Sequence, residues 1–254
     1  MDNNKKPICF VTNCSDSHYH SLGCDKLVKS AKYFYPEIPF FVLGTNEVNK
    51  LGGLDSFTMA KVMHQFIDEY QWVVRFDADS MITGPLDELF DAINSNQYDI
   101  IGVRNNNDYA KAGANEPITQ KGIDTFEYLN AGFVATNSKA FIEGWMDCNA
   151  MFGHMCPFVE QSTLNSLSQK FKTLILDRKE NPVFYGVAGL YGNGDENQTH
   201  WDSWREIIVA HGEFYLDGKK VKVIHHAGGS NDYKLGFHLF SDQARRRLIE
   251  IIEG

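Results

Sequence analysis

Short apolar runs alternate with helical stripes of apolar residues along the first hundred positions of the chain. Runs rich in β-branched and aromatic residues that end at glycine, proline or polar residues are typical of buried strands. The pattern predicts strands at Pro7–Thr12, Phe40–Leu43, Trp72–Phe76 and Tyr98–Val103. Apolar spacing of three and four predicts helices at His18–Phe34, Ser56–Tyr70 and Leu86–Ile93. This alternation indicates an α/β fold, with a central, mainly parallel sheet and helices on both of its faces.

The second half contains the same kinds of element, separated by two long irregular stretches. Strands are predicted at Phe133–Thr136, Thr173–Leu176 and Val221–His225, and helices at Ser138–Phe152, Val159–Phe171 and Leu239–Ile252. Residues 104–124 and 177–200 lack apolar periodicity, and loops of that length are usually functional or disordered. Because no linker or repeat interrupts the chain, we expect a single domain over residues 1–254.

Composition and charge narrow the classes of function. A chain of 254 residues, 43% of them hydrophobic, suits one large domain with a substantial core. The net charge of -9 gives no sign of the basic face of a nucleic-acid-binding protein, or of broad adhesion to anionic membranes. No apolar stretch has the length of a membrane span, and the N-terminus lacks a secretory signal pattern.

The cysteines point to a reducing compartment. They are five in number and scattered, which suggests free thiols, so we expect a cytoplasmic protein. The spacing of Cys148 and Cys156 around His154 fits no usual zinc pattern.

Asp77 and Asp79 form the most informative pair in the chain. They follow the predicted strand Trp72–Phe76, and Ser80–Pro85 reads as the turn that ends it. The carboxyl ends of strands are where open α/β sheets bind ligands, and two carboxylates there suit Mg²⁺ or Mn²⁺. Strand alternation puts Arg75 on the same side as Asp77, where it could pair with that carboxylate or contact a ligand. An arginine at the edge of the core that extends its charged end into solvent is an equal possibility. The competing interpretation is that both aspartates are turn formers or helix caps.

Small polar residues follow the first predicted strand. Thr12, Asn13 and Asp16 could hydrogen-bond a nucleotide base or ribose, although a capped turn explains them equally well. The sequence contains neither the glycine fingerprint of dinucleotide-binding folds nor a P-loop.

A histidine pair marks the end of the last predicted strand. An imidazole is a good third ligand for Mn²⁺ beside two carboxylates, and alternation along a strand directs only one of the pair toward a ligand. We predict His226, which lies further out of the strand, as that ligand. Gly229 would let the backbone approach a phosphate, which Lys234 could neutralise.

Polar groups also precede a strand and open a helix in the middle of the chain. Asn130 lies within an Asn-Ala-Gly segment, and Glu160 and Gln161 lie in the first turn of a predicted helix. The helix residues could satisfy the helix N-terminus or face a cleft that accepts sugar hydroxyls. Lys61, on an earlier helix, could reach a ligand or remain solvated.

Taken in order, these features resemble a metal-dependent GT-A glycosyltransferase, and in pattern glycosyltransferase family 8. The matching segments are VTN at 11–13, DAD at 77–79, NAG at 130–132, EQSTLN at 160–165, and HHAGG with Lys234. The resemblance implies a Rossmann-like GT-A domain with a nucleotide-binding half at about 1–103 and an acceptor half at about 125–254. It implies transfer of a sugar from a UDP-sugar to a hydroxyl acceptor such as a glycan, with retention of configuration.

The resemblance also implies roles for individual residues. Asp77, Asp79 and His226 would hold Mn²⁺ or Mg²⁺. Asn130 and Gln161 would hold the donor sugar, with Glu160 at the reacting face. The nucleotide and its phosphates would be held by Thr12, Asn13, Asp16, Lys61, Gly229 and Lys234.

Two other classes remain open from the residues alone. A haloacid-dehalogenase-like phosphohydrolase would use Asp77 as its nucleophile, but its motif normally follows the first strand. A carbohydrate-binding protein could keep the fold without catalysis.

Two irregular segments are expected to serve the same site. Residues 104–124 would form a lid over the donor. Residues 181–204 would bind the acceptor, because sugars present apolar faces that pack on aromatic rings. The aromatic residues in this second segment are Phe184, Tyr185, Tyr191, Trp201 and Trp204.

Overall fold

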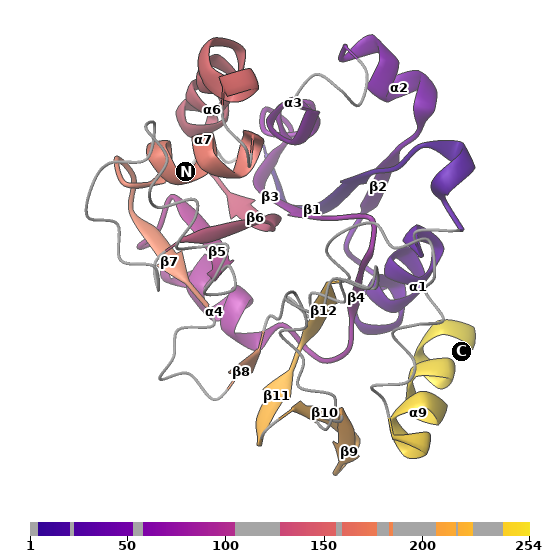
Figure 1. The fold of residues 1–254 in the computed structure, drawn as a ribbon. Coiled ribbons are helices and arrows are strands. Elements are labelled where there is room, and N and C mark those ends of the chain that lie inside the picture. Colours follow the sequence, from indigo (N-terminus) through magenta and orange to yellow (C-terminus); the bar gives the residue numbers. More distant parts are fainter. Residues whose placement is uncertain are drawn as a thin grey trace.

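The computed structural model of the chain describes most of the predicted elements (Figure 1). The described residues are 5–20, 23–52, 58–104, 128–155, 159–176, 183–184, 207–216, 218–225 and 241–254.

A six-stranded mixed sheet forms the centre of the fold, in the spatial order β2-β1-β3-β6-β5-β7. Its strands are β1 (Lys6–Asn13), β2 (Phe40–Leu43), β3 (Tyr70–Phe76), β5 (Ile100–Arg104), β6 (Leu129–Thr136) and β7 (Thr173–Ile175). β1 is parallel to β2 and β3, and β5 is parallel to β7. β6 pairs antiparallel with both β3 and β5. The prediction of a central, mainly parallel sheet is therefore confirmed.

Strand alternation divides the core into two layers, one on each face of the sheet. Cys9, Val11 and Val73 pack on one face against α3 (Thr58–His64), α6 (Lys139–Phe152) and α7 (Val159–Ser168). Phe10 and Val74 pack on the other face against α1 (Cys24–Phe34) and α4 (Asp87–Ser95). Each face of β1 and β3 is thus buried, which is why these strands read as continuous apolar runs.

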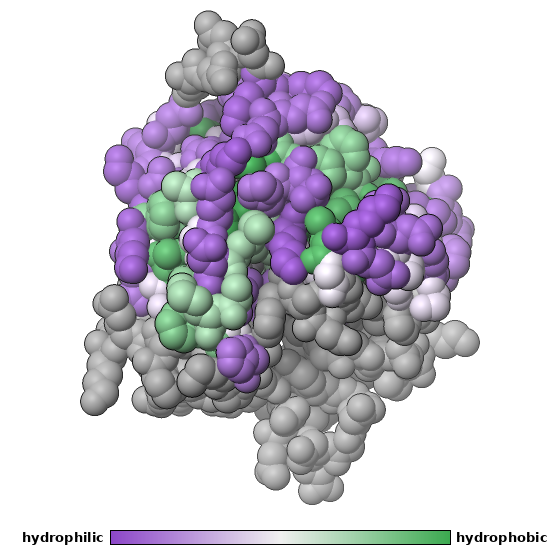
Figure 2. All heavy atoms as spheres, turned by 90° about the horizontal axis from the view of Figure 1, so that it is seen from above, coloured by the Kyte–Doolittle hydropathy of each residue, from purple (hydrophilic) through white to green (hydrophobic). Residues whose placement is uncertain are grey.

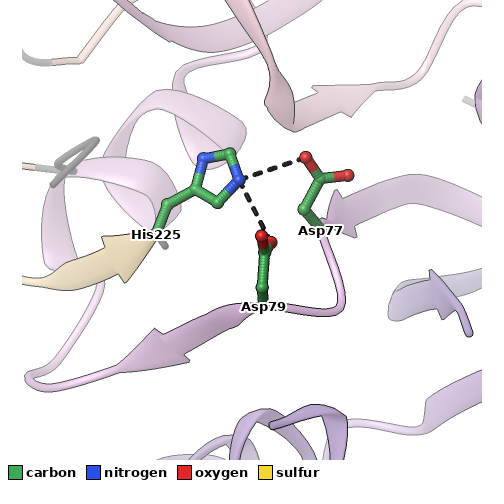
Figure 3. Close-up of side chains that lie close together, drawn as sticks. All are labelled: Asp77, Asp79 and His225. Carbon is green, nitrogen blue, oxygen red and sulfur yellow. Dashed lines mark ion pairs between the residues drawn. The ribbon is translucent and has the colours of Figure 1, made fainter. Parts of the chain in front are cut away.

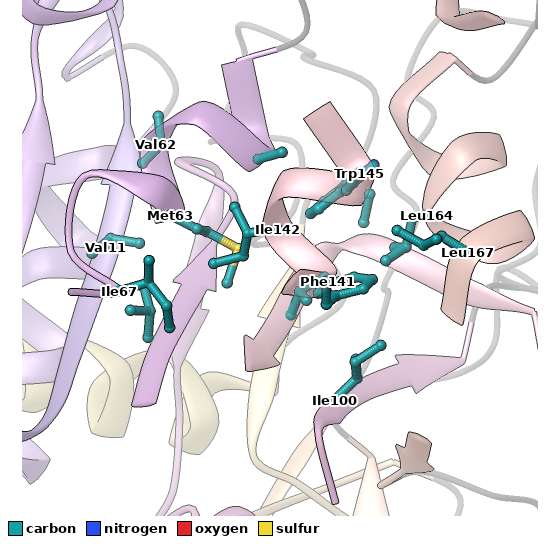
Figure 4. Packing of buried hydrophobic residues seen from close by; sticks show 14 of the residues in the cluster. Val11, Val62, Met63, Ile67, Ile100, Phe141, Ile142, Trp145, Leu164 and Leu167 are labelled. Carbon is teal, nitrogen blue, oxygen red and sulfur yellow. The ribbon is translucent and has the colours of Figure 1, made fainter. Parts of the chain in front are cut away.

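Of the two layers, the one packed beneath α6 and α7 is the larger (Figure 4). Phe141, Ile142 and Trp145 of α6 are fully buried there. The Trp145 indole Nε1 donates to the Glu160 carbonyl at 3.0 Å and lies 3.1 Å from Thr163 Oγ1, so it joins α6 to α7. Ser138 caps α6 by accepting a hydrogen bond from the Phe141 N–H.

Two small sheets complete the described strands. β4 (Ser80–Ile82) pairs antiparallel with β12 (Val223–His225). The other sheet has the order β8-β11-β10-β9 and consists of β8 (Val183–Phe184), β9 (Ile208–Ala210), β10 (Glu213–Leu216) and β11 (Lys219–Val221). It packs with α9 (Asp242–Glu253) through a third apolar cluster, and Figure 1 shows both below the central sheet.

The remaining described helices are short: one 3-10 turn follows β1, one helix follows β2, and the other 3-10 turn follows α6. They are the 3-10 turns η1 (Asp16–His18) and η3 (Gly153–Met155) and the helix α2 (Thr45–Lys50).

Several predicted boundaries are wrong for identifiable reasons. The helix predicted to Tyr70 ends at His64, because the Gln65 and Phe66 N–H groups bond to carbonyls three residues back and tighten the chain into turns. Ser80–Ile82, predicted as turn, is a strand because β12 pairs with it from far along the sequence. The last predicted strand, Val221–His225, is divided at Lys222 between two sheets.

Among the described residues no helix is long and apolar enough to cross a bilayer. Figure 2 shows the molecule from above the view of Figure 1. On this face, hydrophilic residues cover much of the described surface, with smaller hydrophobic areas between them.

We predict that Trp145→Phe destabilises the chain by about 1–3 kcal/mol, because it removes buried volume and a hydrogen bond between α6 and α7. Urea unfolding followed by circular dichroism measures the change. Met151→Ala on the same helix is the matched control, because that side chain is 55% exposed and should change stability by less than about 0.5 kcal/mol. Equal effects of the two substitutions would contradict this packing.

Candidate metal centre

Asp77, Asp79 and His225 converge at the carboxyl end of β3 (Figure 3). The His225 Nε2 atom lies 3.2 Å from Asp77 Oδ2 and 3.2 Å from Asp79 Oδ1. Asp77 follows β3, Asp79 directly precedes β4, and His225 ends β12. The register of β4 and β12 pairs His225 with Ser80, which brings the imidazole to the aspartates. The long-range β4–β12 pairing therefore completes the cluster.

Charge balance determines the protonation of this cluster. Burial alone would raise the pKa of Asp77, but the Arg75 charge and the His225 contact outweigh it and hold that pKa well below its usual range. Burial alone would lower the pKa of His225, yet the adjacent Asp79 and Asp77 carboxylates raise it to about 10. Without a cation, a protonated His225 therefore lies between the Asp77 and Asp79 side chains.

The cluster fits a divalent cation by its donor chemistry. Its two carboxylate oxygens and one imidazole nitrogen all lie within 4.8 Å of one another. Such a mixed oxygen and nitrogen set suits Mn²⁺, and carboxylates suit Mg²⁺. A cation would replace the proton on His225, because only the neutral imidazole can coordinate a metal.

A β-bulge in β6 lies directly beside the cluster. The adjacent residues Gly102 and Val103 of β5 pair with Val134 and Asn130 of β6, so residues 131–133 bulge out of that ladder. The displaced Gly132 carbonyl accepts a hydrogen bond from the Asp77 N–H at 2.8 Å. A Cβ at Gly132 would lie 2.7 Å from His225 Nδ1, so glycine is required for the imidazole to approach.

Site side chains satisfy the remaining polar groups of the bulge. The Ala131 carbonyl accepts from Arg75 Nη1 at 2.9 Å, and the Ala131 N–H donates to Gln161 Oε1 at 3.1 Å. The Gly132 N–H donates to Asn130 Oδ1 at 2.7 Å. The bulge can be buried because these bonds replace its lost strand pairing.

Arg75 is more deeply embedded in the site than the sequence indicated. Its side chain is 3% exposed and pairs with Asp77 at 2.6 Å, which confirms the predicted contact. It also donates to Asn13 Oδ1 at 3.3 Å. The guanidinium therefore joins the ends of β1 and β3 to the bulge in β6.

The structure brings His225 to the aspartates, whereas we predicted His226 because it lies further out of the strand. His226 lies outside the described residues, so its predicted role remains a prediction. The sequence feature that could have pointed to His225 is Gly132, whose missing side chain leaves room for the imidazole. The sequence does not reveal, however, that the segments containing Gly132 and His225 meet. Gly229 and Lys234 also lie outside the described residues, as do residues 105–124 of the expected lid and most of the expected acceptor segment.

Glu160 and Asn165 form hydrogen bonds that hold the segments around the site in place. Glu160 opens α7, and its Oε1 accepts from the Met59 N–H at 2.9 Å in the first turn of α3. Burial raises the pKa of Glu160 to about 7. Asn165 bonds both the N–H and the carbonyl of Leu129, at 2.6 and 2.9 Å, and so fixes the start of β6. The first-turn position predicted for Glu160 and Gln161 is confirmed, and the role of Asn165 was missed.

Of the other predicted nucleotide-binding residues, Thr12 and Asp16 lie near the carboxyl end of β1, and Lys61 lies within α3. The Asp16 N–H donates to Thr45 Oγ1 at 2.9 Å, and Asp16 Oδ1 accepts from the Thr45 N–H at 3.3 Å. Thr12 is fully buried, and its hydroxyl has no hydrogen-bond partner in the part of the chain that the structure describes. Lys61 Nζ donates to the Leu51 carbonyl at 2.7 Å. Their contacts with a nucleotide remain predictions.

Comparisons with known proteins support the fold. No family model and no curated protein sequence matches the chain. The galactosyltransferase LgtC, solved with donor and acceptor sugar analogues, matches with a TM-score of 0.55 and 14% identity over 96% of this chain and 95% of its own. A glycosyltransferase involved in glycosylation of the major capsid of PBCV-1 matches with a TM-score of 0.54 and 10% identity, over 92% and 98% of the two chains.

The bifunctional glycosyltransferase WbbM also matches, with a TM-score of 0.54 and 14% identity over 98% of this chain and 50% of its own. The chain thus spans about half of WbbM and nearly all of LgtC. At these identities the likeness concerns the fold. The chain therefore has the GT-A fold of these glycosyltransferases.

Proposed function

We propose that the chain is a metal-dependent glycosyltransferase that moves a sugar from a UDP-sugar to a hydroxyl acceptor, such as a glycan, with retention of configuration. The observation that carries this proposal is the convergence of Asp77, Asp79 and His225 at the carboxyl end of β3 in a GT-A fold. A bound Mn²⁺ or Mg²⁺ would stabilise the charge that develops on the leaving diphosphate.

The chain's own residues would position the donor beside this centre. Asp77, Asp79 and His225 would hold the cation that contacts the diphosphate. Asn130 and Gln161 already bond the β6 bulge, and we propose that both residues also contact the donor sugar. We also propose that Glu160 lies near the reacting face of the donor sugar.

Thr12, Asn13 and Asp16 are proposed for the uridine, and Lys61, Gly229 and Lys234 for the phosphates. A lid at 104–124 and an acceptor surface at 181–204 also remain proposals.

The two alternatives are not favoured. Asp77 is bonded to Arg75 and in contact with His225, so it is held rather than free to act as the nucleophile of a phosphohydrolase. Measurements of enzymatic activity distinguish both alternatives from our proposal.

A screen of nucleotide sugars that scores UDP release with and without Mn²⁺ tests the proposal. We expect Mn²⁺-dependent release from at least one UDP-sugar when an acceptor is present. Release of phosphate from simple esters would favour the phosphohydrolase, and binding without turnover of any donor would favour the binding protein.

We predict that Asp79→Asn lowers the rate of transfer by at least about 100-fold while leaving the fold intact. It removes one metal ligand, and the lost charge stabilisation is worth several kcal/mol of barrier. UDP release and far-ultraviolet circular dichroism measure the two properties. Near-normal transfer at saturating Mn²⁺ would refute this ligand assignment.

We predict that His225→Gln weakens Mn²⁺ binding by at least about tenfold, because the amide is a poorer ligand for Mn²⁺ than imidazole. Electron paramagnetic resonance of free Mn²⁺ measures the affinity. His64→Gln is the matched control, since His64 lies at the end of α3 beside Glu143 and away from the aspartates. Equal Mn²⁺ affinity of all three proteins would count against His225.

We predict that Glu160→Gln becomes more stabilising, relative to the native chain, as the pH rises from 5 to 8.5. The folded-state pKa of about 7 exceeds the ordinary value of 4.5, so the contribution of Glu160 to native stability is greatest below pH 4.5 and declines as the pH rises toward 7. The full difference would be up to roughly 3 kcal/mol. Urea unfolding at both pH values measures it, and a difference that does not change with pH would contradict the buried state of this carboxyl group.

A further inference from the structure

The two oxygens of Asp77 have different partners. Oδ1 lies 2.6 Å from Arg75 Nη2, whereas Oδ2 lies 3.2 Å from His225 Nε2. Asp79 Oδ1 lies 3.2 Å from the same imidazole nitrogen. Figure 3 shows one Asp77 oxygen facing His225 and the other turned away. Asp77 therefore offers a single oxygen toward the candidate metal position.

Arg75 is held in place by other contacts, so it has little freedom to release Asp77 Oδ1. Its guanidinium also donates to the Ala131 carbonyl in the bulge and to Asn13 Oδ1 at the end of β1. The side chain is buried, so moving it would leave a buried carbonyl and a buried charge without partners. The arrangement at Asp77 is thus imposed by three segments of the fold.

We propose that Arg75 is a positioning residue that selects Mn²⁺ or Mg²⁺ over Ca²⁺ by withholding one oxygen of Asp77. Ca²⁺ takes six to eight oxygen ligands and often binds a carboxylate through both oxygens. Mg²⁺ requires an octahedral set and keeps several waters, so one oxygen from each carboxylate serves it well. This inference rests on the proposed function, because the cation is the one that would hold the donor diphosphate.

The ratio of Mn²⁺ to Ca²⁺ affinity isolates this effect. Removing the Arg75 charge strengthens the attraction for any divalent cation, so the ratio of two such affinities largely cancels the change in charge. The imidazole of His225 itself prefers Mn²⁺ to Ca²⁺, but it is present in every variant compared. A change in the ratio therefore reports the coordination of Asp77.

The experiment measures Mn²⁺ affinity by electron paramagnetic resonance and Ca²⁺ affinity by competition, on the full chain without nucleotide. Arg75→Gln removes the charge and frees Asp77 Oδ1, and Arg75→Lys keeps a positive donor for it. Lys6→Gln is the matched control, because it removes the same charge at an exposed pair with Glu69 at the start of β1.

We expect the native chain and Lys6→Gln to share one preference for Mn²⁺ over Ca²⁺. Arg75→Gln should lower that preference by about tenfold, which corresponds to about 1.4 kcal/mol, and Arg75→Lys should retain most of it. An Arg75→Gln variant that binds Mn²⁺ with an unchanged ratio would overturn the inference. A native chain that binds no Mn²⁺ would instead overturn the metal centre itself.

A second measurement covers the case in which Arg75→Gln does not fold. Infrared difference spectra of Asp79→Asn with added Ca²⁺ report the carboxylate stretches of Asp77. A wide splitting of the symmetric and antisymmetric bands, typical of coordination through one oxygen, supports the inference. A narrow splitting, typical of coordination through both oxygens, would overturn it.

Discussion

The bulge in β6 is the constraint on which the candidate site depends. Residues 131–133 leave the ladder with β5, and the peptide groups of Ala131 and Gly132 need other partners. Arg75, Asp77, Asn130 and Gln161 supply them. Because these residues come from β3, β6 and α7, the bulge ties the candidate site together before any ligand binds.

Charge compensation explains how Asp77 remains ionised in a partly buried position beside Asp79. Arg75 neutralises Asp77 from one side, and the protonated His225 lies between Asp77 and Asp79 on the other. The absence of a side chain at Gly132 gives the imidazole its space. A divalent cation would therefore enter a site whose ligands are already gathered, and it would displace a proton rather than reorganise the chain.

Local pattern predicted the parts of the site that depend on neighbours in sequence. The sequence predicted the apolar strand before Asp77 and the position of Arg75 on the same side as Asp77. It also predicted the helix whose first turn contains Glu160. The missing parts depend on contacts between distant segments. The pairing of β4 with β12 brings His225 to the site, and the packing of α7 on α3 turns Glu160 toward Met59. Neither contact leaves a periodic signal in the sequence.

The most direct test of the central claim is the anomalous scattering of manganese in crystals of the chain grown with MnCl₂ and UDP. Our account predicts one strong manganese peak bounded by Asp77, Asp79 and His225, with the UDP diphosphate in contact with the same ion. Bound UDP without manganese at these three residues, or a manganese peak elsewhere on the chain, would contradict the account.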